Sequence, residues 1–142
     1  MDDAVAEVFA SMLDRSCDAV EPARAASTCI SATITFSGTL EARCVVEFPP
    51  RSAQNLATAF LGSGDATAVE WDDAMIADAV GEFCNMIAGG WKKRLGAPAW
   101  SSNLSVPSIE TGPTRLRHTA ATYLRRNYAF DDSPFVVDLT LA

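Results

Sequence analysis

Apolar residues recur along the chain with two different periods, and each change of period marks a predicted element. They return every three or four positions from Ala4 to Leu13 and from about Asp72 to Leu95, which predicts two helices. From Thr28 to Phe48 they alternate with polar residues on both sides of a short glycine-containing turn, which predicts a hairpin with one buried face. Between these segments, a shorter helix is predicted from Arg51 to Leu61.

The last third of the chain is predicted to form strands, and alternation is clear in the last of them, at Phe135, Val137, Leu139 and Leu141. Three further strands are predicted over Leu104–Ile109, His118–Tyr128 and Phe135–Leu141. The order α-β-β-α-α-β-β-β, with short connections, predicts an α+β fold. It would hold a mainly antiparallel sheet of about five or six strands with three helices packed on it.

The composition favours one globular unit. The chain has 142 residues, the length of an ordinary domain, and 49% of them are hydrophobic, which is enough for a core. We therefore expect residues 1–142 to form a single domain. No window reaches about 18 uncharged apolar residues, and the first residues do not resemble a secretion signal. We expect a cytoplasmic protein that is not inserted in a membrane.

The charge and the metal-binding residue types narrow the function classes. A net charge of −7 argues against binding nucleic acid through its phosphates, which would require a basic surface. The basic run Lys92-Lys93-Arg94 suits the C-terminal end of the long helix, where cations meet the negative end of the helix dipole. The four cysteines include no C-x-x-C pair and His118 is the only histidine, so we expect no metal site.

The long predicted helix carries two different faces when its residues are placed about 100° apart. The apolar residues of its core stripe are Ile76, Ala79, Val80, Phe83, Met86, Ile87 and Gly90. Asp78, Glu82, Asn85 and Gly89 fall in a separate band about 60° wide. We term these four residues the ridge.

A solvated helix face is the ordinary explanation for such a band, but two details favour a functional role. Asn is a mediocre helix former, and Gly81, Gly89 and Gly90 each cost roughly 1 kcal/mol relative to alanine inside a helix. Close approach of another backbone would explain the glycines. The residues by themselves leave both explanations open.

The ridge and its surroundings resemble the CheX branch of the CheC/CheX/FliY phosphatases, chemotaxis proteins that dephosphorylate the response regulator CheY. The resemblance rests on Asp78-x3-Glu82-x2-Asn85, on Gly89 and on Pro107 further along the chain. The order of predicted elements also matches over essentially the whole chain. The 21 residues between Asn85 and Pro107 are one fewer than in the family's pattern.

This resemblance implies a CheC/CheX-like fold and a phosphatase that hydrolyses the aspartyl phosphate of a CheY-like receiver domain. In the family the receiver supplies Mg²⁺ and a lysine, so no cofactor of the chain's own is implied. Glu82 would pair with that lysine, and Asn85 would orient the attacking water. Asp78, Gly89 and Pro107 would contact the partner or shape the surface that it meets. Phosphoryl transfer depends mainly on positioning and charge neutralisation, so one well-placed amide suits the task.

Two alternatives stay open. The first is a CheX-like module that binds a receiver or dimerises without turnover. The second is an unrelated hydrolase with Asp78 and Glu82 as an acid–base pair, although exposed carboxylates at i and i+4 lack the burial that tunes such pairs. CheX-type members commonly form homodimers through sheet edges, and we expect the apolar run Phe135–Leu141 to be such an edge.

Overall fold

One seven-stranded sheet organises the computed structural model, which describes residues 5–7, 17–20, 28–39, 41–61, 72–96, 101–112 and 122–141. The strands are β1 (Asp18–Ala19), β2 (Cys29–Ser37), β3 (Ala42–Phe48), β4 (Asn103–Leu104), β5 (Ser108–Gly112), β6 (Thr122–Phe130) and β7 (Ser133–Leu141). Their order is β1-β6-β7-β3-β2-β4, β5 also pairs with β2, and all pairings are antiparallel. The α+β class and the mainly antiparallel sheet are confirmed.

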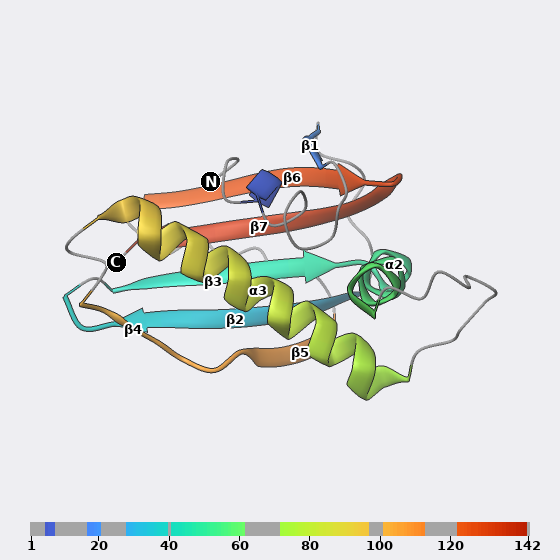
Figure 1. Cartoon of the computed structure of the whole chain (residues 1–142), viewed down its shortest axis with the longest axis horizontal. Helices are drawn as coiled ribbons and strands as arrows, with labels where there is room; N and C mark the ends of the chain where they lie inside the picture. Colours follow the sequence, from blue (N-terminus) through green and yellow to red (C-terminus); the bar gives the residue numbers. More distant parts are fainter. Residues whose placement is uncertain are drawn as a thin grey trace.

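Two helices pack on one face of this sheet (Figure 1). α2 (Pro50–Leu61) contacts β2, β3 and β7, and α3 (Asp73–Leu95) crosses the sheet diagonally over β2, β3 and β5. A third helical segment, residues 5–7, carries the buried Val5. The remainder of the predicted helix Ala4–Leu13 lies outside the described residues, as do residues 118–121 of the predicted strand that corresponds to β6.

α3 begins and ends where its sequence predicts. The Asp72 carboxylate caps the first turn by accepting a hydrogen bond from the Met75 backbone N–H at 2.8 Å. Basic residues 92–94 occupy the last turn, and Gly96 follows with a φ of 85°, a conformation that favours glycine. Arg94 also donates a hydrogen bond to Glu7, which holds the pKa of that exposed carboxyl below its usual value.

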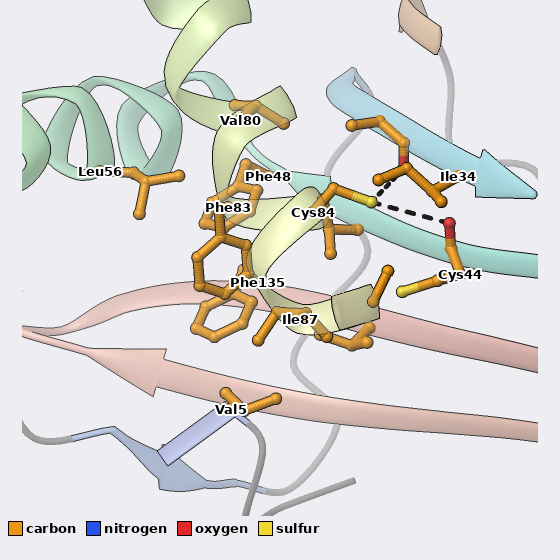
Figure 2. Close-up of a cluster of buried hydrophobic side chains, with 14 of the residues drawn as sticks. Val5, Ile34, Cys44, Phe48, Leu56, Val80, Phe83, Cys84, Ile87 and Phe135 are labelled. Atoms are coloured by element: carbon orange, nitrogen blue, oxygen red, sulfur yellow. Dashed lines mark hydrogen bonds between the residues drawn. The ribbon is translucent and has the colours of Figure 1, made fainter. Parts of the chain in front are cut away.

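Aromatic side chains fill the space between α3 and the sheet (Figure 2). Phe48 and Phe135 stack with ring centroids 4.9 Å apart, and Phe83 of α3 meets them edge-on at 5.3 and 5.4 Å. The buried Cys84 thiol donates to the backbone carbonyl of Ala32 at 3.5 Å and that of Cys44 at 3.7 Å. These contacts fix which side of α3 faces the sheet, and therefore which side faces out.

The predicted strand Leu104–Ile109 is wrong as a single element, because the structure divides it into β4 and β5. Thr33 pairs with Ser108 and Phe36 pairs with Leu104, so two residues of β2 face the three residues 105–107 of the neighbouring segment. An extra residue on one strand is a β-bulge, and Pro107, which has no backbone N–H, is accommodated there. We term residues 105–107 the bulge.

The prediction that Phe135–Leu141 is a sheet edge is also wrong. The run belongs to β7, which lies inside the sheet with β6 on one side and β3 on the other. Alternating apolar residues reveal one buried face, but they do not reveal whether a strand is paired along both of its edges. A tight turn at Asp131 and Asp132, with φ of 46° and 60°, folds the last strand directly back against β6.

Candidate active site

α3 presents the ridge to solvent because its other side packs on the sheet. Asp78, Glu82 and Asn85 are exposed, and Gly89 is half-buried. The buried residues of this helix are Ile76, Ala79, Val80, Gly81, Phe83, Cys84, Ile87, Ala88 and Trp91. The two sets occupy different sides of the helix, as its period of about 3.6 residues requires.

The polar side chains of the ridge are available to an outside partner. Within the described part of the chain, the side chains of Asp78, Glu82 and Asn85 make no hydrogen bond or ion pair. Glu82 and Asn85 are three residues apart, so they are neighbours on the helix surface. An approaching group therefore meets a carboxylate, which accepts hydrogen bonds and carries charge, beside an amide, which both donates and accepts.

Pro107 lies next to the ridge, where the bulge rests on α3. A Cβ added to Gly81 would lie 3.4 Å from the Cβ of Pro107 and 3.4 Å from the Cδ1 of Ile109. Gly81 directly precedes Glu82 and lies one turn before Asn85. The structure thus brings the distant Pro107 into the neighbourhood of the helix residues with which it forms one sequence motif.

The helix glycines have different surroundings. The buried Gly81 is closely packed, but the atoms nearest to it belong to the side chains of Pro107 and Ile109 rather than to the other backbone that the sequence predicts. At Gly89, by contrast, no described atom would lie within 4 Å of an added Cβ, so the space above it is open. Gly89 therefore interrupts the row of side chains on the ridge directly beyond Asn85.

Sequence reasoning does not find the apolar residues on this side of the ridge. Val106 is 84% exposed and Ile109 is 36% exposed, and they flank Pro107 along the chain. The one feature of the sequence that could have indicated them is their closeness to Pro107, which is part of the resemblance to the CheX branch. The location of Pro107 and Ile109 beside α3 depends on strand register, which the sequence pattern alone leaves undefined.

Other chemistry-bearing residues lie apart from the ridge or outside the described residues. The four cysteines are free thiols: Cys29, Cys44 and Cys84 are buried, and burial raises the pKa of the half-buried Cys17 to about 12. Among the described residues, no three His, Cys, Asp or Glu side chains form a group suited to a metal ion. His118 lies outside the described residues.

None of the helices in the described ranges is both long and apolar enough to cross a membrane.

The family described as Chemotaxis phosphatase CheX matches residues 30–123, which is more than half of the chain and includes the whole ridge and Pro107. A comparison with curated protein sequences finds no match.

Solved structures of low sequence identity share the fold. The chemotaxis protein CheX from Vibrio vulnificus is 17% identical with a TM-score of 0.79, over 99% of this chain and 92% of that one. CheX from Desulfovibrio desulfuricans is 20% identical with a TM-score of 0.77, over 99% and 95% of the two chains. A chain of the CheX-CheY-BeF3-Mg²⁺ complex from Borrelia burgdorferi is 17% identical with a TM-score of 0.64, over 98% and 93%. The CheC/CheX-like fold is therefore confirmed.

Proposed function

The chain belongs to the CheX family of chemotaxis phosphatases, and we propose that it accelerates hydrolysis of the aspartyl phosphate on a CheY-like response regulator. The complex from Borrelia burgdorferi supports this partner, since it joins a protein of the same fold to CheY with BeF3 and Mg²⁺. The proposal treats residues 1–142 as one CheX-like domain acting in the cytoplasm. Mg²⁺ enters with the receiver, and the chain contributes no cofactor.

The observation that carries the proposal is the pair Glu82 and Asn85, exposed side by side and without partners among the described residues. Glu82 forms an ion pair with the receiver's lysine and so fixes how the two proteins dock. Asn85 enters the receiver's site and orients a water molecule in line with the phosphorus atom. An amide suits this step because it donates and accepts hydrogen bonds at once without changing its charge.

Three further residues support this contact. Asp78 lies one turn before Glu82 and extends the charged part of the ridge toward the partner. The open space above Gly89 leaves room for the partner's active-site loops. Pro107, seated beside Gly81, shapes the flank of the site.

Loss of phosphate from a phosphorylated CheY-type receiver with Mg²⁺ tests this function. The wild type is expected to accelerate the loss, and Asn85→Ala is expected to reduce that acceleration by about 100-fold or more, the usual cost of removing a positioned polar group. Asn103→Ala is the matched control, because Asn103 is an exposed asparagine in β4 rather than on the ridge.

Two results would contradict the proposal. If Asn85→Ala remains as active as the wild type, Asn85 does not position the water. If the wild type binds receivers but accelerates none of them, the chain is a non-catalytic CheX-like binding module.

We also propose that the chain forms a homodimer through a free edge of its sheet. Because β7 is paired on both sides, this edge must be another strand. β6 pairs with β1 over only two residue positions, which leaves most of its outer edge without a strand partner among the described residues. A free edge of this length favours pairing with a second copy.

A further inference from the structure

Exposed apolar side chains gather around the ridge. In the described part of the chain, the large hydrophobic side chains that are exposed are Val20, Met75, Leu95, Val106 and Ile109. Three of these five lie near the ridge: Met75 lies one turn before Asp78, Ile109 lies against Gly81 together with Pro107, and Val106 directly precedes Pro107. Val106 is the most exposed of them, at 84%. A single exposed apolar residue is ordinary, but a group of them beside a polar site is typical of an interaction surface.

Val106 is exposed in the bulge between two anchored neighbours. On one side, the Ser105 backbone N–H donates to the Thr35 carbonyl at 2.9 Å, and the Thr35 N–H donates to the Ser105 Oγ at 2.9 Å. On the other side, Pro107 rests on α3 at Gly81. Valine itself has few side-chain rotamers. A partner that covers Val106 therefore pays little conformational entropy to order it.

The contact between Pro107 and Gly81 sets the distance between the bulge and the polar residues of the ridge. Gly81 is the residue before Glu82 and lies one helical turn from Asn85. Residues one turn apart are about 5–6 Å from each other on a helix surface. A domain that covers Glu82 and Asn85 thus extends over the bulge without any change in this protein.

From this placement we propose that Val106 and Ile109 form an apolar contact for the receiver domain, next to the polar contact made by the ridge. The inference rests on the proposed function, because it takes the occupant to be the receiver that docks on Glu82 and Asn85. A receiver that fits this contact would carry an apolar side chain close to its phosphorylated aspartate. The apolar contact supplies affinity and selects among receivers, and Asn85 supplies the chemistry. This division follows the usual anatomy of interfaces, in which a few buried apolar anchors carry much of the binding energy.

The test compares Val106→Ser and Val106→Asp with the wild type in dephosphorylation of a CheY-type receiver. Because Val106 is so exposed, neither substitution removes core packing. We expect the KM for the phosphorylated receiver to rise about 3- to 10-fold for serine and further for aspartate, while kcat stays within about twofold. Val20→Ser is the matched control, since Val20 is an exposed valine beside β1, at the opposite end of the sheet from β5. It should leave both constants unchanged.

Binding measured apart from turnover separates this inference from the proposed function. The probe is a beryllofluoride-activated CheY-type receiver with Mg²⁺, titrated with Asn85→Ala and with Asn85→Ala combined with Val106→Asp. Weaker binding of the double variant supports the apolar contact even if the wild type shows no turnover, in which case only the phosphatase function fails. Equal binding, or an unchanged KM in an active Val106→Asp variant, overturns the inference while the function stands. A lower mass of Val106→Asp in light scattering would also overturn it, because the occupant would then be a second copy of this chain.

Discussion

Gly89 follows Asn85 by one helical turn, and it is the ridge residue with no side chain. Nothing in the described ranges lies within 4 Å of an added Cβ, so a side chain can begin there without meeting a described atom. Gly89→Ala is expected to raise the free energy of unfolding by about 0.5–1 kcal/mol, because glycine is a poor helix former. Gly89→Leu should also fold, but its side chain would fill the space that the proposed receiver enters.

Two measurements check this pair of variants. Denaturant unfolding gives the stabilities, and receiver dephosphorylation gives the activity. We expect Gly89→Leu to slow dephosphorylation about 10-fold or more through steric exclusion, at a stability no lower than that of the wild type. A fully active Gly89→Leu would show that the partner does not approach this part of the ridge.

At the residue scale, the sequence predicts the exposed ridge well because helical periodicity is local. Asp78, Glu82 and Asn85 are separated by three and four positions, so any regular helix places them together. Val106 is different, since its exposure depends on hydrogen bonds between Ser105 and Thr35, which are 70 positions apart. No local pattern encodes a contact between such distant residues.

The packing of the bulge on α3 depends on the size of residue 81. A Cβ at this position would be in ordinary contact with Pro107 and Ile109, at 3.4 Å from each. Gly81→Ala is therefore expected to be neutral or to stabilise the helix by up to about 1 kcal/mol. Gly81→Leu adds more atoms than the gap can hold, and overpacking of this kind costs about 1–3 kcal/mol.

Gly81→Leu is expected to change activity as well as stability. In Gly81→Leu the bulge must move away from α3, so Pro107 and Val106 shift relative to Asn85. We expect a higher KM for the phosphorylated receiver in Gly81→Leu, and wild-type kinetics in Gly81→Ala. Thermal unfolding together with the phosphate-release assay would measure both effects. Loss of activity in the alanine variant would show that flexibility at Gly81, rather than close packing, is what the site needs.

Element prediction fails at the bulge. Leu104, Val106 and Ile109 do not keep one alternation, and β2 offers two residues opposite residues 105–107, so the extra residue breaks the strand. The bounds of α3 are predicted closely, since Asp72 and Gly96 are strong local signals. Helix ends can thus be predicted from the sequence, whereas sheet register cannot.

At the scale of the whole molecule, the sheet separates two surfaces. β5, beside the ridge, lies at one end, and β6 lies toward the other, with β7, β3 and β2 between them (Figure 1). The position of β7 inside the sheet is not predictable from its sequence, because a final strand can close a sheet or be inserted into it with the same apolar alternation. The topology leaves most of the outer edge of β6 without a strand partner among the described residues. The proposed second copy would pair there, across the sheet from the proposed receiver contact beside β5.

This arrangement predicts that dimerisation and catalysis are independent. Light scattering at micromolar concentration should give twice the mass of one chain, as expected for a closed two-fold dimer. Dilution through the dissociation range should then leave the dephosphorylation rate per chain unchanged, because α3, which carries the ridge, packs mainly on β2 and β3, and β7 separates these strands from β6. A single-chain mass at micromolar concentration would remove the dimer. A rate per chain that falls on dilution would place the dimer contact next to the ridge, on the β5 side of the sheet.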